Sequence, residues 1–433
     1  MVPPLSAPAR AFAWFCWIAG GLVRLAYIWV LHPLTQHVYS DMQGYVERAE
    51  RWAAGAPETI VDTLYPPGAS WWFGLLYRLD PSWALAGLAQ WLVSLGVLGI
   101  AALIARRLYG NGAMLVTLFV AAFYPPLIHY PALFLAENPF CLVVLLAVYC
   151  TLRALAAAGS SGLVAWAVGA GLSVGVGMAL KNTMVLPALF VLLGLAVRTP
   201  FRRWRLLPLS AAALASLLVL TPLAVRCTAL SGHACLVANN LGMNVLMGHN
   251  GAIGEYRWRD SARGVFMSFT AVENNVRGYA ASMDLPFGAY DNGANLELAR
   301  RWVAAHPQSA VSAGLGHMGT TFFSAVLWPA ATLGGIDWGA MTRVWFVGWM
   351  LLPSLFRFGR VLVQYAPRSG ASATSAASEV LLLMPAVGLA AAAFISIGEV
   401  RFRVPFDLLI LIYAAPSLAA LAHVGAHHHR QRS

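Results

Sequence analysis

The sequence predicts an all-α polytopic membrane protein, and two observations carry this prediction. Of its 433 residues, 59% are hydrophobic and only 10% are charged. The apolar residues gather in stretches long enough for a helix to cross a bilayer, which takes roughly 17–25 residues. A backbone in hydrocarbon must satisfy its own hydrogen bonds, so these stretches are expected to be helices.

Hydropathy indicates about ten spanning helices in a single domain over residues 1–433. They are expected at 12–31, 83–105, 112–128, 133–152, 163–180, 185–197, 206–225, 344–356, 380–397 and 404–421. The sixth and eighth segments are short for a span. The first segment is longer than a signal peptide and lacks a small-residue cleavage site, so an uncleaved anchor is expected.

The distribution of charge orients the chain. The net charge is +11, but the basic residues are spread over short loops, which excludes a nucleic-acid surface and is typical of cytoplasmic loops. With the amino terminus inside, Glu379 is the one acidic residue of 17 on the cytoplasmic side. The arginines expected there are Arg106, Arg107, Arg153, Arg198, Arg202, Arg203, Arg205, Arg357, Arg360, Arg368, Arg430 and Arg432. Both termini are therefore expected in the cytoplasm and the active side outside.

Two long regions are expected on the outer side, at 32–81 and 226–343. In the first, apolar residues at helical spacing after Ser40-x-x-Gln43 predict an amphipathic helix in the membrane interface, opened by a capping box. In the second, the stretch 239–251 is rich in Gly and Asn and predicts irregular turns, followed by a helix from about Asn295 that ends or bends at His306-Pro307. The segment 310–333 is expected to be re-entrant or interfacial. Cys227 and Cys235 lie in an oxidising compartment and either form a disulfide or remain free.

Asp41 is the most informative residue of the first outer region. It follows the first span directly, and Tyr65-Pro66-Pro67-Gly68 lies in the same region. An acid held at the membrane–water boundary indicates chemistry at the bilayer surface on a lipid-linked substrate. The alternative is that Asp41 is only a first-turn acid that stabilises the interfacial helix through its dipole.

Several motifs in order resemble the GT-C glycosyltransferases. The similar branch is bacterial glycosyltransferase family 39, whose members resemble dolichyl-phosphate-mannose protein mannosyltransferases, together with the lipid A aminoarabinose transferases. The matching motifs are Asp41 with Tyr65-Pro66-Pro67-Gly68, Tyr124-Pro125-Pro126-Leu127 with Leu135-Ala136-Glu137, Trp302…His306-Pro307, and Gly398-Glu399-Val400-Arg401-Phe402-Arg403-Val404-Pro405. One departure is that Leu64 and Tyr65 replace the Glu-Lys pair of the aminoarabinose transferases. A metal ligand or phosphate contact at that place cannot be carried over.

The resemblance implies a fold and a reaction. The fold is GT-C-like, with outward-facing juxtamembrane helices. The reaction moves a sugar, with inversion, from a polyprenyl-phosphate carrier to a hydroxyl of an envelope acceptor on the outer face of the bacterial inner membrane. The acceptor is lipid A, another glycan or a protein. Asp41 would be the base, and cations would stabilise the departing phosphate.

Candidate phosphate ligands are cations close to the outer face. Lys181 is the only lysine of the chain and follows the fifth span, where it either binds phosphate or snorkels at a helix end. Glu399, Arg401 and Arg403 form a charged cluster between two apolar spans, with Arg401 the preferred phosphate ligand. Glu137 is expected to pair with Lys181 or Arg401, either structurally or as part of the substrate site.

The remaining candidates are weaker. Tyr65, Asn244 and His249 are candidate substrate contacts, although a plain loop role is the alternative for the last two. No spacing of metal ligands is evident, and a requirement for a divalent cation stays open. Arg24, inside the first span, is expected to hold neighbouring helices together.

Two other classes of function compete with the enzyme. A secondary transporter or a flippase for lipid-linked sugars would show repeated halves and polar residues at the midplane, for example a cavity lined by Arg24 and Asp407. A non-catalytic envelope-assembly protein would not need Asp41. In each case the lipid bilayer is the surrounding partner.

Overall fold

The structure, a computed structural model, describes residues 3–39, 41–157, 159–197, 206–249, 256–261, 264–269, 291–325, 327, 332–333, 336–365 and 372–432. Apart from two short β-hairpins, the secondary structure of these residues is helical. The expected all-α polytopic fold class is confirmed. Ser40, and with it the expected capping box, lies outside the described residues, as does the loop with Arg198 and Arg202.

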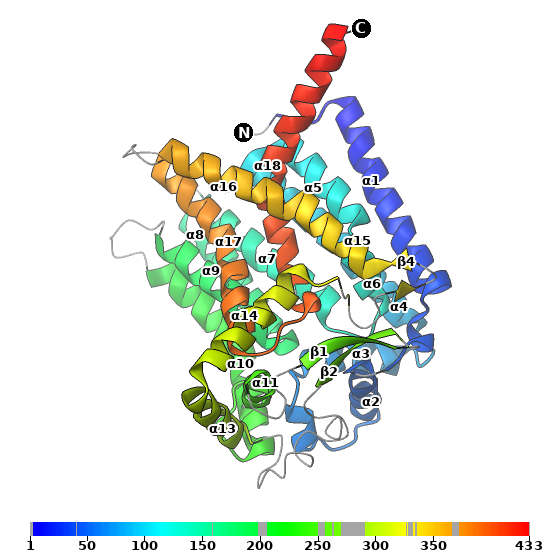
Figure 1. Ribbon diagram of the computed structural model, residues 1–433, viewed down its shortest axis with the longest axis vertical. Helices are drawn as coiled ribbons and strands as arrows, with labels where there is room; N and C mark the ends of the chain where they lie inside the picture. The colour runs from blue at the N-terminus through cyan, green and yellow to red at the C-terminus, as the bar shows by residue number, and fades with distance from the viewer. Residues whose placement is uncertain are drawn as a thin grey trace.

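Long apolar helices form the body of the protein (Figure 1). Those long and apolar enough to cross a membrane are α1 (Ala7–Ala26, extended by the π-helical turn η1, Tyr27–Leu31), α4 (Ala84–Tyr109), α7 (Glu137–Leu155), α8 (Ser160–Leu180), α10 (Leu206–Ser231) and α18 (Val400–Arg432). A seventh candidate is α5 (Asn111–Phe123) with α6 (Pro125–His129) and η4 (Tyr130–Ala132), bent by 61° at the break. The bend follows Tyr124, where two prolines interrupt the helix.

The remaining expected spans also fall on helices, but on shorter or interrupted ones. These are α9 (Val185–Val197), the series α15 (Trp338–Trp345), η7 (Phe346–Leu351) and α16 (Leu352–Tyr365), and α17 (Ser372–Ile395). Six or seven helices of the described chain therefore meet the criteria of length and composition for a span. The expected count of ten is not confirmed.

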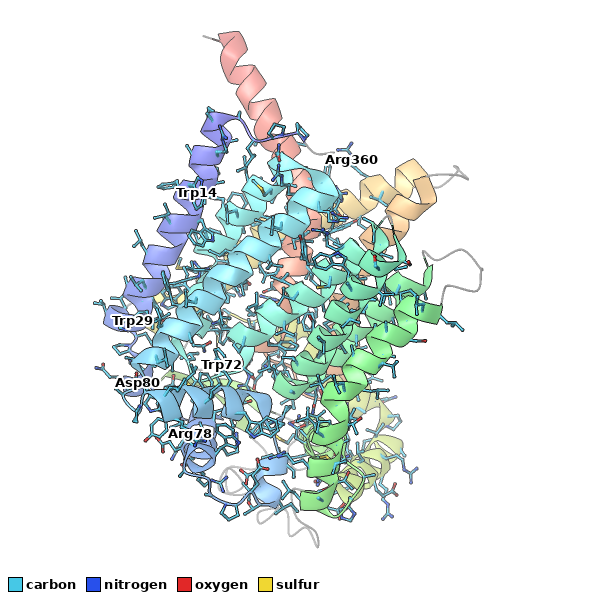
Figure 2. All side chains as sticks on the ribbon, turned by 180° about the vertical axis from the view of Figure 1, so that it is seen from behind. Trp14, Trp29, Trp72, Arg78, Asp80 and Arg360 are labelled. Atoms are coloured by element: carbon cyan, nitrogen blue, oxygen red, sulfur yellow. A yellow bond between two sulfur atoms is a disulfide. The ribbon has the colours of Figure 1, made fainter. Side chains whose placement is uncertain are left out.

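The two ends of the bundle differ. Both chain termini lie at one end, and α2 (Asp41–Ala53), α3 (Gly68–Leu79) and α13 (Asn292–Ala305) lie at the other (Figure 1). Asp80 and Arg360 mark these opposite ends, and the exposed side chains of Trp14 and Trp29 line the outer edge of the bundle (Figure 2). Parts of both long regions expected outside thus lie at the end away from the termini.

The first of these regions contains η2 (Leu34–Gln36), α2, η3 (Ile60–Thr63) and α3. The predicted amphipathic helix is α2, which buries Met42, Tyr45 and Ala49 and exposes Glu47. The second region contains α11 (Leu241–Gly248), the antiparallel pair β1 (Tyr256–Ser261) and β2 (Gly264–Phe269), α13, α14 (Pro307–Phe323), and the short pair β3 (Thr332–Leu333) and β4 (Ile336–Asp337).

One expectation for the second region was wrong. The Gly/Asn-rich stretch forms the helix α11 rather than irregular turns over 241–248. Its amino end is held by the Asn292 side chain, which accepts a hydrogen bond from the Gly242 N–H, and Leu246 is buried. Tertiary contacts thus outweigh the low helix propensity of Gly and Asn. The expected break at His306-Pro307 is confirmed, because it separates α13 from α14.

Two further sequence expectations are settled by contacts. Cys227 and Cys235 form a disulfide that closes a loop at the end of α10. Arg24 is buried and donates hydrogen bonds of 2.7 and 2.9 Å to the carbonyl oxygens of Ala122 and Ala121, so it ties α1 to α5 as expected.

Candidate active site

An ion pair between Asp41 and Arg401 joins the first outer region to the last span. Asp41 is the first residue of α2, and Arg401 lies in the first turn of α18. Arg401 Nη1 donates a hydrogen bond of 2.8 Å to Asp41 Oδ2. The Asp41 side chain is 25% exposed and that of Arg401 is 12% exposed, so the pair is sheltered but still reached by solvent.

Glu399 adds a second carboxylate to Arg401. Its Oε2 forms an ion pair with Arg401 Nε, and Glu399 lies buried just before α18. Burial raises the pKa of Glu399, and the Arg401 charge opposes that rise. One guanidinium therefore forms ion pairs with two carboxylates, each through a different nitrogen.

Lys181 and Glu137 form the neighbouring pair. Lys181 caps the carboxyl end of α8, Glu137 begins α7, and Lys181 Nζ lies 2.5 Å from Glu137 Oε1. The two cations share an aromatic neighbour, because Lys181 Nζ is 5.4 Å and Arg401 Cζ 5.2 Å from the centroid of the Phe402 ring. The expected pairing of Glu137 with a cation is confirmed, and Lys181 is the partner.

Tyr65 contacts Asp41 from the other side. Its hydroxyl lies 3.4 Å from Asp41 Oδ1 and donates toward it. The Tyr65-Pro66-Pro67 turn leads into α3, whose first residue is Gly68. A Cβ at Gly68 would lie 2.6 Å from the carbonyl oxygen of Ala179, so a glycine is needed for α3 to start this close to the end of α8. This contact brings the start of α3, which follows Tyr65, against the end of α8, where Lys181 lies.

Arg403 does not join this cluster. It is buried, its Nε lies 2.8 Å from Asp407 Oδ1, and Tyr124 donates a hydrogen bond of 2.5 Å to Asp407 Oδ2. Arg403 also stacks on Phe346, 3.5 Å from the ring centroid. The structure therefore places Arg403 in a bond network inside the bundle rather than beside Asp41. Arg24 and Asp407 belong to two separate networks, Arg24 with the carbonyl oxygens of α5 and Asp407 with Arg403 and Tyr124.

Asn244 lies on α11 and His249 directly follows that helix, next to the turn that carries Glu399. His249 is buried, with its ring 5.7 Å from that of His317 and 6.3 Å from that of Trp302. A Cβ at Gly248 would overlap the carbonyl oxygen of Ser396, so α11 packs directly on this turn. Within the described part of the chain, neither residue contacts Asp41, Arg401 or Lys181.

Arg48 is a site residue that the sequence reasoning missed. Its guanidinium carbon lies 4.9 Å from the Tyr65 ring centroid and 5.2 Å from that of Tyr45. A signal was present, because Asp41, Tyr45 and Arg48 follow the i, i+4, i+7 spacing of one helix face.

The cluster offers three carboxylates, Asp41, Glu399 and Glu137, to two cations, Arg401 and Lys181. All three carboxylates are engaged by these cations. Among the residues that the structure describes, no group of three or more His, Cys, Asp or Glu side chains is arranged to hold a metal ion. A divalent cation stays an open expectation, and the arrangement supports an acid–base and phosphate-binding site.

Comparison with known proteins gives a partial family match. Residues 65–226, less than half of the chain, match the family model described as dolichyl-phosphate-mannose-protein mannosyltransferase. The matched segment includes Tyr65, Glu137 and Lys181. None of the curated proteins matches the chain.

Solved structures with the same fold include archaeal oligosaccharyltransferases. AglB from Archaeoglobus fulgidus, in complex with an inhibitory peptide and a dolichol-phosphate, has a TM-score of 0.56 and 15% identity over 98% of this chain and 52% of its own. The Archaeoglobus fulgidus oligosaccharyltransferase tethered to an acceptor peptide has a TM-score of 0.56 and 14% identity over 98% of this chain and 51% of its own. The chain thus spans about half the length of these proteins.

ArnT from Cupriavidus metallidurans, bound to undecaprenyl phosphate, is more distant, with a TM-score of 0.42 and 14% identity over 96% of this chain and 77% of its own. The fold shared with the archaeal oligosaccharyltransferases is the GT-C fold, and the match of residues 65–226 to the mannosyltransferase family agrees with it. The predicted resemblance to GT-C proteins is confirmed. The chain is a multi-pass membrane protein with a GT-C fold.

Proposed function

We propose that this protein is a glycosyltransferase that moves a sugar from a polyprenyl-phosphate carrier to a hydroxyl of an envelope acceptor. The observation that carries the proposal is the Asp41–Arg401 pair, where a partly exposed carboxylate at a helix start meets a guanidinium at the mouth of the last span. A base and a phosphate-binding cation are the two groups that this reaction needs. The match of residues 65–226 to a mannosyltransferase family supports the donor class.

In this proposal Asp41 removes the proton of the acceptor hydroxyl. The hydroxyl oxygen attacks the anomeric carbon as the bond from that carbon to the phosphate oxygen breaks, so the configuration inverts and polyprenyl phosphate leaves. Arg401 and Lys181 stabilise the negative charge on the departing phosphate. An archaeal oligosaccharyltransferase of the same fold is known in complex with a dolichol-phosphate, and this is consistent with a lipid-phosphate ligand for the present protein.

The carboxylates that hold the two cations must then make room for the phosphate. Glu399 and Glu137 are buried partners of Arg401 and Lys181, and they compete with a phosphate for the same nitrogens. Burial raises the pKa of Glu399, so Glu399 takes up a proton more readily than an ordinary glutamate, and proton uptake would free Arg401 for the phosphate. Tyr65 orients Asp41 through its hydroxyl. Asn244 and His249 remain candidates for sugar contacts from α11.

The proposed location is the bacterial inner membrane, with both termini cytoplasmic and the site facing the periplasm. The opposite placement of the termini and of α2 supports this orientation (Figure 1). Sided labelling of single cysteines introduced at Glu47 and at Arg360 in intact cells tests it. Labelling of the first position only by an impermeant reagent agrees with the proposal, and the reverse pattern contradicts it.

The reaction is tested with purified protein in nanodiscs, a panel of polyprenyl-phosphate sugars and an envelope extract as acceptor. Mass spectrometry follows the release of polyprenyl phosphate. Acceptor-dependent release with one donor supports the proposed reaction and names the sugar. Movement of intact donor across the bilayer of a proteoliposome, without release, would instead indicate a flippase.

A further inference from the structure

A pocket lies next to the candidate active site, behind Tyr65. It is formed by α2, the loop before η3, the start of α3 and the outer end of α10. Three of its lining residues are arginines, Arg48, Arg51 and Arg226, and two are acids, Glu58 and Asp62. The residues come from two distant parts of the chain, which the fold brings together at this place.

The charges of this pocket are not balanced. Arg226 binds Glu58 through two hydrogen bonds of 2.6 and 2.7 Å, and Arg51 forms an ion pair with Asp62. Each acid thus has an arginine of its own. Arg48 bonds through Nε to the hydroxyl of Ser70, at 3.3 Å, and has no acidic partner among the described residues. One positive charge is left facing the pocket.

Two nitrogen donors of the arginines that line the pocket lack a hydrogen-bond partner in the described part of the chain. Arg48 Nη2 and Arg226 Nη1 are buried, and neither has a hydrogen-bond partner among the residues that the structure describes. A buried donor without a partner is costly, and it is costlier on a charged group. Guanidinium groups bind carboxylates and phosphates through paired N–H donors. The chemistry of this wall therefore fits an anionic group.

The side chain of Tyr65 lies between Arg48 of the pocket and Asp41. Arg48 lies against one side of the Tyr65 ring, 4.9 Å from its centroid, and the Tyr65 hydroxyl lies 3.4 Å from Asp41 Oδ1. A molecule held by Arg48 would therefore lie across Tyr65 from the candidate base. Lys181 and Arg401, which the proposed function assigns to the donor phosphate, lie on the Asp41 side.

We propose that this pocket binds a carboxylate or phosphate group of the acceptor, with Arg48 and Arg226 as its ligands. The acceptor is then an acidic molecule, anchored behind Tyr65 so that its hydroxyl reaches Asp41. This inference rests on the proposed function for the identity of the acceptor. Trp71, against which Arg226 stacks at 5.4 Å from the ring centroid, holds that guanidinium in place.

Direct binding tests the site without turnover. The full-length protein in phosphatidylcholine nanodiscs is titrated by calorimetry with glucuronate, glucose 6-phosphate and glucose. Both anionic sugars are expected to bind and glucose is not. Arg48→Gln is expected to lower the affinity for the anionic sugars about tenfold, as the loss of one charge-assisted hydrogen bond implies. Arg78→Gln, an exposed arginine on α3, is the matched control and keeps wild-type binding (Figure 2).

A second variant tests the site independently in case Arg48→Gln does not fold. The double variant Glu58→Gln/Arg226→Gln removes both charges of the Arg226–Glu58 pair, so no carboxylate is left without its cation. It is also expected to lower the affinity for the anionic sugars. Equal binding of glucose and the anions, or wild-type binding by both variants, would overturn the site. The same titration in nanodiscs that contain phosphatidylglycerol distinguishes a lipid head group from a soluble acidic sugar as the ligand of the pocket. Loss of sugar binding there would assign the pocket to a lipid head group and overturn the acceptor role.

The inference and the proposed function fail separately. Asp41→Asn is expected to bind the anionic sugars like the wild type, because Asp41 does not line the pocket. Release of polyprenyl phosphate without binding of either anionic sugar contradicts only the acceptor site. Binding of both sugars that depends on Arg48, in a protein that releases nothing from any donor, contradicts the glycosyltransferase and with it the acceptor role, while the anion-binding pocket stands.

Discussion

Arg401 and Asp41 form a hydrogen bond of 2.8 Å although 360 residues separate them in the chain. The contact joins two distant parts of the bundle, because Asp41 begins α2, in the first outer region, and Arg401 lies at the start of the last span, α18. It also decides what Asp41 can do. A carboxylate held by Arg401 and Tyr65 has a fixed orientation and stays accessible, which a base at a membrane surface requires.

Arg401→Lys is expected to abolish most of the turnover although it keeps the charge. Lysine has a single compact ammonium group and cannot bridge Asp41 and Glu399 through two nitrogens, as the Arg401 guanidinium does. Turnover should fall by about 10²-fold or more, within the usual range for a misplaced catalytic group. Rates are compared with those of Arg300→Lys, which changes an exposed arginine on α13. Equal rates for the two variants would show that the bridge is not needed.

Glu399→Gln is expected to tighten donor binding. Glu399 competes with a donor phosphate for Arg401, and its amide analogue carries no charge. Burial raises the pKa of Glu399, so acidification neutralises this group at a higher pH than an ordinary glutamate. Donor affinity of the wild type should therefore rise as the pH falls, and that of Glu399→Gln should change less. Donor binding by the two proteins, titrated between pH 8 and pH 5, measures the difference. A weaker donor affinity in the variant would count against Arg401 as the phosphate ligand.

The structural role of Lys181 and its role in phosphate binding can be distinguished by substituting Lys181 alone and together with Glu137. Lys181→Gln leaves Glu137 buried without its cation, so the loss of stability should be about 3–5 kcal/mol. Glu137→Gln/Lys181→Gln removes both charges and should restore most of that stability. Turnover should stay low in the double variant, because the phosphate ligand is still missing. Denaturant unfolding and donor turnover are measured on all three proteins. Recovery of turnover along with stability would make Lys181 a purely structural residue.

The stacked pair His32 and His37 should make the protein acid-sensitive. Burial, and secondly the charge of His37, lower the pKa of His32 from 6.5 to about 4. Since the unfolded state binds the proton more readily, stability is full above about pH 6.5 and is lost as the pH falls toward 4. Thermal unfolding of His32→Gln should depend less on pH in this window than unfolding of the wild type. His306→Gln, at an exposed position, is the control, and equal pH dependence of all three proteins would contradict the account.

The helices were predictable because hydropathy and helix length are local properties. The ten expected segments all fall on helices, and the amphipathic pattern from Met42 to Ala53 placed α2 correctly. The helix α11 was not predictable in the same way. Its Gly and Asn residues disfavour a helix locally, and it is the distant Asn292 that holds its first turn.

Arg401 and Arg403 show why part of the site could not be predicted from the sequence. The two residues stand two positions apart at the start of α18, and such residues do not face the same side of a helix. Arg401 points to Asp41, and Arg403 points into the bundle toward Asp407. Periodicity could show that only one of the two belongs to the site. Which one it is depends on how α18 is rotated against α2 and α14, and that follows from tertiary packing.

The central claim is that Asp41 is the base, and one comparison tests it most directly. Asp41→Asn and Glu47→Gln each neutralise one acid of α2, but Glu47 is exposed and away from Arg401. With the donor identified by the panel, release of polyprenyl phosphate is measured for both, together with donor binding. The account predicts that Asp41→Asn binds the donor and loses about 10²–10⁴-fold in rate, and that Glu47→Gln matches the wild type. A rate for Asp41→Asn within a few-fold of that of Glu47→Gln would contradict it.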